Sequence, residues 1–210
     1  IDQGIVTVDG ATLTTPAFKV LPGMDVPVDG TRVKLKEPPR LWRYHKPSGL
    51  VTTHKDPQGR PTVFEAVEER LPRVISIGRL DLTTEGLLLL TNDGALALQL
   101  ELPGNAWVRR YRIRANGKTD QAALDALGAG VEIDGVTYKP IKATLDQTKG
   151  ANVWITASIT EGKNREIRKV MEHLGWPVTR LIRVAYGPFQ LGNLERDRID
   201  EVPGKVLTSQ

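Results

Sequence analysis

Several residue types and segments are absent or scarce in this sequence of 210 residues. It has no cysteine and only 3 histidines. Disulfides, thiolate chemistry and the commonest structural zinc ligand are therefore excluded, and the scattered histidines show no metal-ligand spacing. No apolar run approaches the roughly 18 residues that span a bilayer, and no charged-then-apolar leader opens the sequence. We expect a cytoplasmic protein whose chemistry, if it is an enzyme, depends on carboxylates, hydroxyls and arginines.

The positive charge is concentrated in the middle of the chain. Residues 1–37 contain 4 basic residues (Lys and Arg) and 5 acidic ones (Asp and Glu). The corresponding counts are 22 basic and 16 acidic in residues 38–190, and 3 basic and 4 acidic in residues 191–210. A sequence pI near 9.4 with the surplus on one domain favours a polyanionic partner, nucleic acid before membrane. Charge is a weak discriminator, so a basic protein without such a partner is the alternative.

The first 37 residues predict a small β unit. "GIVTVDGATL" and "DVPVDGTRVKL" alternate apolar and polar residues around Asp9-Gly10 and Asp29-Gly30, and an Asp-Gly pair is a strong signal for a tight hairpin turn. The unit is too small to hold its own core, and it begins at Ile1 without a methionine. We therefore expect the chain to be a fragment of something longer.

The main domain is predicted over residues 38–192, after the proline-paired linker "KEPPR" and before an extension at 193–210. Strand patterns outnumber helix patterns and mostly turn back sharply, which predicts an α+β fold with a largely antiparallel sheet. Strands are expected in 41–47, 87–92, 108–115, 131–145, 152–159 and 177–189, and helices in 62–71, 95–100, 120–130 and 164–175.

One carboxylate stands in an apolar neighbourhood. In "GRLDLTTEGLLLLTNDG", Asp81 lies between two leucines on the loop into the buried strand Leu87–Leu90. Asp before Thr-Thr commonly bonds nearby backbone amides, so a turn or capping role is one interpretation. Glu85 could form a carboxylate pair with it, as in glycoside hydrolysis, but a spacing of four in a loop fixes no distance.

The segment "VRRYRIRA" places cations on one face of a strand. With a period of two, Tyr111 shares a face with Arg109, whereas Arg110, Arg112 and Arg114 line the other. A solvated strand face is the plain interpretation. Guanidinium groups in a row repel unless anions lie near, however, so we predict that Arg110 and Arg112 bind RNA phosphates.

The helix expected from Asn164 has a charged flank. Arg168 could reach inward to a buried carboxylate, whereas Arg165 and Lys169 could face a phosphate backbone. An amphipathic helix with a charged outer face is the alternative. Docking of the helix onto the sheet is expected through an apolar stripe formed by Ile167, Val170, Met171 and Leu174.

Five segments together resemble pseudouridine synthases that modify ribosomal RNA. "GRLDLTTEGLLLLTNDG" is similar to their catalytic loop, and the branch that unites the type A small-subunit and type B large-subunit enzymes fits best, nearest to type B. The other four are "KPSGLVTTHKDPQGRPTVFE", "RRYRI", "EGKNREIRKVMEHLG" and "RLIRVAYGPFQLG". The resemblance covers roughly residues 40–192. Residues 1–37 resemble the second half of an S4 RNA-binding domain, and Glu166 departs from the glutamine that is common in the family.

The resemblance implies a reaction and roles for particular residues. Such enzymes detach uracil from C1′ of a uridine and reattach it through C5, with no cofactor and no metal. Asp81 would be the catalytic carboxylate, acting as nucleophile or base, with Arg168 as its ion-pair partner. Tyr111 and Leu181 would enclose the base, and Arg79 would hold the flipped nucleotide. Ribosomal RNA, in a precursor or a subunit, would be the substrate of a monomeric enzyme.

Two rival hypotheses belong to other classes of protein. A non-catalytic RNA-binding module in ribosome assembly would tolerate Asp81→Asn. A glycosidase working through Asp81 and Glu85 would be indifferent to Arg168, and a neutral glycan does not call for the basic strand. Neither rival explains why all five motifs occur in order.

Overall fold

The computed structural model describes residues 7–8, 11–12, 27–28, 31–32 and 36–208, and the chain divides into the units Ile1–Pro39 and Arg40–Gln210. In the first unit, β1 (Thr7–Val8) pairs with β2 (Ala11–Thr12), and β3 (Pro27–Val28) pairs with β4 (Thr31–Arg32), both antiparallel. The predicted turns at Asp9-Gly10 and Asp29-Gly30 lie outside the described residues. The S4-like assignment of this unit stays a prediction.

The second unit contains the remaining described elements. Its helices are α1 (Val63–Val67), α2 (Gly94–Glu101), α3 (Gln121–Asp125), α4 (Glu166–His173) and α5 (Gly204–Leu207), with short 3-10 turns at Pro103–Asn105 and Ala126–Ala129. Its strands are β5 (Leu41–Lys46), β6 (Ile75–Ile77), β7 (Thr84–Thr91), β8 (Arg109–Asn116), β9 (Val131–Ile133), β10 (Val136–Tyr138), β11 (Lys142–Lys149), β12 (Asn152–Ile159), β13 (Val178–Tyr186), β14 (Phe189–Gln190) and β15 (Ile199–Glu201).

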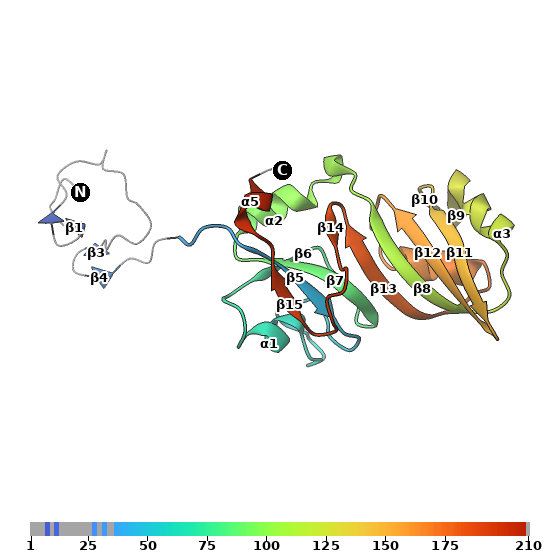
Figure 1. The fold of residues 1–210 in the computed structure, drawn as a ribbon, viewed down its shortest axis with the longest axis horizontal. Coiled ribbons are helices and arrows are strands. Elements are labelled where there is room, and N and C mark those ends of the chain that lie inside the picture. The colour runs from blue at the N-terminus through green and yellow to red at the C-terminus, as the bar shows by residue number, and fades with distance from the viewer. Residues whose placement is uncertain (1–6, 9–10, 13–26, 29–30, 33–35, 209–210) are drawn as a thin grey trace. The chain divides into compact units, whose positions relative to one another are not determined.

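A nine-stranded sheet runs through this unit in the order β11-β12-β8-β13-β7-β5-β15, with β14 and β6 attached at its sides (Figure 1). The α+β class is confirmed, but the sheet is mixed. Its central pair, β7 with β13, is parallel, whereas the other pairs are antiparallel. This parallel pair is not predictable from the local sequence pattern, because the two strands are far apart in the chain and no local turn signals their contact.

The run of leucines in β7 is buried on both faces, as its unbroken apolar pattern predicts. Leu87 and Leu89 pack into a cluster that includes Ala97 and Leu100 of α2. Leu88 and Leu90 point to the opposite side, into a cluster with Val63 and Val67 of α1. β7 is therefore the central strand of a layered half of the unit, with a short helix on each face.

The helix ends follow the capping residues in the sequence. The Thr62 hydroxyl accepts a hydrogen bond from the Glu65 amide at the start of α1, and the Asp93 carboxylate accepts one from the Leu96 amide in α2. α4 begins at Glu166, later than the predicted start at Asn164, because Arg165 has a left-handed backbone with φ of 53°. The apolar stripe of α4 packs into the core as predicted.

The segment after residue 192 belongs to the same unit as the sheet. β15 pairs with β5 through Ile199↔Tyr44 and Glu201↔Trp42, so it forms an edge strand. None of the helices in the described part of the chain is long and apolar enough to cross a membrane.

Gly86 allows the close approach of β7 to β13, and Gly86→Ala should destabilise the protein. Its φ is +105°, and a Cβ there would lie 2.7 Å from the backbone nitrogen of Arg183 and closer still to the Arg183 carbonyl oxygen. We expect Gly86→Ala to lower the free energy of unfolding by about 3 kcal/mol, combining backbone strain with overpacking, in a urea titration.

Gly135→Ala is the matched control, because Gly135 has φ of +78° but no atom within 4 Å of the added Cβ. Gly135→Ala should lower the free energy of unfolding by about 1 kcal/mol, because of the backbone conformation alone. Equal losses in the two variants would contradict the proposed role of close strand packing.

Candidate active site

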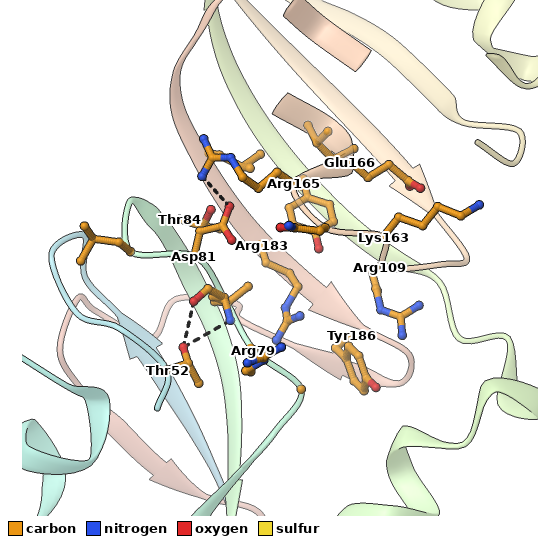
Figure 2. A pocket seen from close by; sticks show the side chains of 18 of the residues that line it. Thr52, Arg79, Asp81, Thr84, Arg109, Lys163, Arg165, Glu166, Arg183 and Tyr186 are labelled. Carbon is orange, nitrogen blue, oxygen red and sulfur yellow. Dashed lines mark hydrogen bonds and ion pairs between the residues drawn. The ribbon is translucent and has the colours of Figure 1, made fainter. Parts of the chain in front are cut away.

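A cavity of about 810 Å³ opens where the loop before β7, the strands β8 and β13 and the segment before α4 come together (Figure 2). Asp81, Tyr111 and Leu181 all line it, together with the more exposed Arg79 and Arg165. Residues 51–53 and Glu101 also contribute to the lining, so residues far apart in the chain form one pocket. The sizes of small-molecule sites in proteins span this volume.

The strand register explains why three of these side chains share a face. Tyr111 of β8 lies directly opposite Arg183 of β13, and residues opposite each other in an antiparallel pair point to the same side of the sheet. Leu181 is two residues before Arg183 and so points to that side as well. Leu181 is also paired with Thr84, three residues after Asp81.

A β-bulge in β13 adds another aromatic residue to this face. The register between β8 and β13 shifts between Arg183 and Ala185, so that Tyr186 pairs with Arg109. A one-residue bulge moves the following side chains to the other face of the strand. Tyr186 and Arg109 therefore line the pocket, and the Arg109 guanidinium lies 5.1 Å from the centre of the Tyr186 ring.

The loop that carries Asp81 is anchored through its backbone on both sides. The Thr52 hydroxyl donates to the Leu80 carbonyl at 2.9 Å and accepts from the Leu80 amide. The fully buried Lys46 ammonium donates to the carbonyls of Leu82 at 3.2 Å and Thr84 at 2.7 Å. Burial lowers the Lys46 pKa to about 8, so these bonds are charge-assisted at neutral pH.

The Asp81 carboxylate faces two arginines of the α4 segment. Arg165 Nη1 donates to Asp81 Oδ2 at 3.1 Å (Figure 2). Arg168 Nε lies 3.9 Å from the same oxygen. Arg168 also donates to the Thr84 hydroxyl at 3.3 Å. Within the described residues no backbone amide donates to this carboxylate. Asp81 is thus ion-paired rather than used as a turn-capping residue.

These contacts differ in detail from the sequence-based expectation. Arg168 was expected to be the ion-pair partner and Arg165 to face phosphate, whereas Arg165 makes the shorter contact with Asp81. The left-handed backbone of Arg165 was not readable from the sequence. The Asp81 side chain is also 30% exposed, because Leu80 turns into the core while the carboxylate faces the pocket.

The remaining predicted substrate-binding residues lie outside the pocket. Arg110 and Arg112 are exposed on the face of β8 opposite Tyr111, and the Arg112 guanidinium lies 5.0 Å from the ring centre of Trp154. Lys169 is exposed on α4. None of the three lines the cavity around Asp81, so they cannot contact the same atoms as Tyr111 does.

Glu85 does not form a carboxylate pair with Asp81. Arg180 binds it in a bidentate fashion at 2.9 and 3.2 Å, and Arg196 approaches it at 3.3 Å. The residue is buried on β7 and does not line the cavity. This arrangement removes the geometric basis of the glycosidase hypothesis.

Sequence reasoning missed two buried charged residues that line the pocket. Arg183 and Glu166 are each only 3% exposed. The signal for Arg183 was its position two residues after Leu181 on a strand, which places the two on one face. Glu166 was noted only as a departure from the glutamine common in the family.

Glu166 is held beside a second carboxyl group. No N–H or hydroxyl group of the described residues donates to either of its oxygens, and its hydrogen-bonding neighbour is Glu161. Burial, followed by the nearby Glu161, raises the Glu166 pKa to about 8. Glu161 accepts from the Lys139 amide at 2.8 Å and pairs with Lys163 at 3.0 Å. At neutral pH, Glu166 is therefore mostly protonated and can donate to Glu161.

The chain matches the sequence family described as RNA pseudouridylate synthase over residues 40–173. It is 48% identical over 205 residues to an uncharacterized RNA pseudouridine synthase of Rickettsia felis, covering 98% of this chain and 89% of that protein. It is 41% identical over 199 residues to the ribosomal large subunit pseudouridine synthase B of Salmonella typhi, covering 91% of this chain and 68% of that protein.

Solved structures agree on the fold. A crystal structure of a pseudouridylate synthase superposes with a TM-score of 0.71 at 22% identity, covering 99% of this chain and 89% of that one. Human RNA pseudouridylate synthase domain containing 1 gives a TM-score of 0.55 at 13% identity, covering 78% of each chain. The chain belongs to the RNA pseudouridine synthase family, as the five motifs indicated, and the protein is an RNA pseudouridine synthase.

Replacing Glu166 by glutamine should raise stability at alkaline pH. Between about pH 4.5 and 8 the folded protein binds a proton at Glu166 that the unfolded chain has released, so the free energy of unfolding falls as pH rises through this window. The glutamine side chain cannot ionise and can donate to Glu161. We expect Glu166→Gln to be more stable than wild type by roughly 1–3 kcal/mol at pH 8 in urea titrations.

The same comparison at pH 4.5 is the control, because both side chains are then neutral in the folded protein and in much of the unfolded ensemble. The advantage of the variant should shrink there. A difference in stability that is the same at both pH values would rule out ionisation of Glu166 as its cause.

Proposed function

We propose that this enzyme converts a specific uridine of large-subunit ribosomal RNA into pseudouridine, with Asp81 as its catalytic carboxylate. The similarity to the Salmonella large subunit enzyme supports the RNA class. The observation that carries the assignment of the site is that Asp81, Tyr111 and Leu181 line one pocket and that Asp81 lies beside two arginines. This arrangement suits a carboxylate acting on the sugar of a base that enters the pocket.

The two arginines place positive charge beside the Asp81 carboxylate. Arg165 at 3.1 Å is about half exposed, whereas Arg168 at 3.9 Å is largely buried. In our proposal Arg168 stays beside Asp81 throughout, and Arg165 moves to an RNA phosphate when substrate binds. The carboxylate then acts at the sugar, either as nucleophile at C1′ or as base.

Tyr111 and Leu181 would enclose the uracil ring. The buried Tyr111 offers an aromatic surface, and Leu181 offers an aliphatic one. Apolar contacts of this kind hold a flat ring without fixing its edge in one orientation, which a base that turns over requires. Tyr111 also presents a hydroxyl for proton transfer at C5.

RNA phosphates would be bound at several exposed cations. Arg79 and Lys163 line the mouth of the pocket and are exposed, so they can contact the backbone next to the flipped nucleotide. Arg110 and Arg112 on the far face of β8, and Lys169 on α4, would bind flanking RNA. Flipping a base costs a few kcal/mol, and phosphate contacts of this kind offset that cost.

Residues 1–37 are proposed to be the C-terminal half of an S4-like RNA-binding domain, and 38–192 the catalytic domain. The division of the chain after Pro39 supports a boundary near this point. The resemblance of the segment "IDQGIVTVDGATLTTPAFKVLPGMDVPVDG" to S4 domains supports its role.

Asp81→Asn should abolish pseudouridine formation while the fold is retained. The amide is nearly isosteric but can neither attack C1′ nor accept a proton, so we expect at least about a 10³-fold loss in rate. The test is pseudouridine mapping of large-subunit ribosomal RNA from cells lacking the enzyme, complemented with wild type or with Asp81→Asn. Asp134→Asn, in the exposed β9–β10 turn, is the matched control and should restore the site.

If one site disappears in the deletion strain and only wild type and the control restore it, the proposal stands. Restoration by Asp81→Asn would instead favour the non-catalytic RNA-binding role. A missing pseudouridine in small-subunit rather than large-subunit RNA would correct the substrate and leave the catalytic assignment intact.

Substituting both far-face arginines should weaken RNA binding without slowing the chemical step. Because Arg110 and Arg112 are outside the pocket, Arg110→Gln/Arg112→Gln should raise Kd and reduce the slope of log K against log salt by up to about 2, with single-turnover rates at saturating enzyme unchanged. An unchanged salt slope would show that this face does not contact RNA.

A further inference from the structure

Arg183 is a buried cation without a carboxylate partner. Its Nε donates to the Leu87 carbonyl at 2.8 Å, but Nη2 is buried and has no acceptor. Within the described residues no Asp or Glu oxygen lies within 4 Å of it, and the like-charged Arg109 acts to lower its pKa. Burying a charged group that has an unused hydrogen-bond donor costs folding free energy unless an acceptor pairs with that donor.

The neighbours of Arg183 define where that missing partner would lie. Tyr111 is opposite it in the sheet, Leu181 is two residues away on the same face, and its guanidinium lies 5.1 Å from the centre of the Tyr186 ring. Arg183 lines the pocket that contains Asp81 (Figure 2). Burial lowers its pKa, while the phenols of Tyr111 and Tyr186 oppose that shift. Two of these neighbours, Tyr111 and Leu181, are the groups that would enclose the uracil ring.

The depth at which Arg183 is buried in the pocket indicates that its partner is a base rather than a phosphate. Arg79, Lys163 and Arg165 are exposed at the mouth, where the backbone of an RNA would pass. Arg183 is 3% exposed and lies among rings and a leucine. A flipped nucleotide inserts its base into the pocket and leaves its phosphates outside. The group able to reach Arg183 is therefore the uracil.

We propose that Arg183 is a catalytic residue that stabilises the negative charge on uracil as its bond to the sugar breaks. This inference rests on the proposed function of the pocket. The N1–C1′ bond breaks with its electron pair passing to uracil, whether Asp81 attacks C1′ or removes a proton from C2′. The resulting anion spreads its charge over N1, O2 and O4. The unused N–H of Arg183 donates to one of these oxygens.

The second half of the reaction discharges this anion. The ring turns over, its electron pair forms the C5–C1′ bond, and the proton at C5 is lost while N1 gains one. If Asp81 had attacked C1′, the bond between them breaks as the C5–C1′ bond forms, and the electron pair returns to the carboxylate. If Asp81 had instead taken the C2′ proton, it returns that proton. Arg183 keeps all its protons and acts through charge alone, as a preorganised donor aimed at developing negative charge. Its planar group can follow the charge from one carbonyl oxygen to the next as the ring rotates.

The first test is single-turnover kinetics of Arg183→Gln and Arg183→Lys on RNA with uridine or 5-fluorouridine at the target. We expect Arg183→Gln to slow loss of the N-glycoside about 100-fold with little change in Kd, and Arg183→Lys to recover part of that loss. Fluorine stabilises the anion of the departing ring, so the loss of rate in Arg183→Gln should be about tenfold smaller with 5-fluorouridine than with uridine. An equal defect on both substrates would overturn the proposal.

Arg43→Gln is the matched structural control. Arg43 also donates to a backbone carbonyl, that of Gln190 at 2.6 Å, but it does not line the pocket. It should lower stability in urea without a substrate-dependent change in rate. A loss in Arg183→Gln that follows stability or RNA affinity alone would assign Arg183 a merely structural role.

A second measurement needs no variant and decides the matter if Arg183→Gln does not fold. Wild-type protein is titrated by NMR with uracil and with 5-nitrouracil, whose nitro group makes the ring an anion at neutral pH. We expect 5-nitrouracil to bind at least about tenfold more tightly, and excess inorganic phosphate not to displace it. Equal binding, or displacement by phosphate, would overturn the proposal, the latter in favour of a phosphate site.

Failure of this inference and failure of the proposed function give different results. If Asp81→Asn is inactive while Arg183→Gln reacts at the wild-type rate with both substrates, only the role of Arg183 is lost. If wild type forms no pseudouridine in large-subunit RNA, the proposed substrate fails first.

Discussion

The parallel ladder between β7 and β13 is the contact on which the rest of the main unit depends. It joins the half of the sheet built on β5 and β15 to the half built on β8, β12 and β11. Because Gly86 has no side chain, the two strands come close enough for Thr84, just after the Asp81 loop, to lie beside Leu181. Asp81 comes from one half of the sheet and Tyr111 from the other, so the pocket exists only because this seam is closed.

Charge in the pocket is graded with depth. Arg79, Lys163 and Arg165 are exposed at the mouth, Asp81 lies partly exposed behind them, and Arg183 lies at the buried end. A carboxyl group in the same wall, Glu166, avoids adding negative charge because burial beside Glu161 keeps it protonated at neutral pH. The result is a lining in which cations outnumber the acidic side chains Asp81 and Glu101, which suits a polyanionic substrate and a reaction that transiently makes an anion.

Much of this arrangement could be predicted from the sequence, where the information is local. Helices were predicted over 62–71 and 95–100, where α1 and α2 lie, and the unbroken run Leu87–Leu90 indicated burial on both faces. The period of two placed Arg110 and Arg112 on the face opposite Tyr111. The motifs identified the family and pointed to Asp81 as the carboxylate at the pocket.

What could not be predicted depends on contacts between distant segments or on single backbone angles. The parallel pairing of β7 with β13 is not preceded by a local turn that would predict it. The left-handed φ of Arg165 accompanies a contact of this residue with Asp81 beside that of Arg168, and the bulge after Arg183 brought Tyr186 into the pocket. Arg183 itself resembled an ordinary strand residue until the register showed that it lies beside Tyr111.

The anchoring of the Asp81 loop has a consequence for how this site can change over evolutionary time. Thr52 and Lys46 hold the loop through the carbonyl oxygens of Leu80, Leu82 and Thr84, and every amino acid supplies a carbonyl at those positions. Substitution of the side chains at 80, 82 and 84 therefore leaves these acceptor groups in place. The position of the Asp81 carboxylate is thus set by the backbone and is decoupled from the side chains of its neighbours.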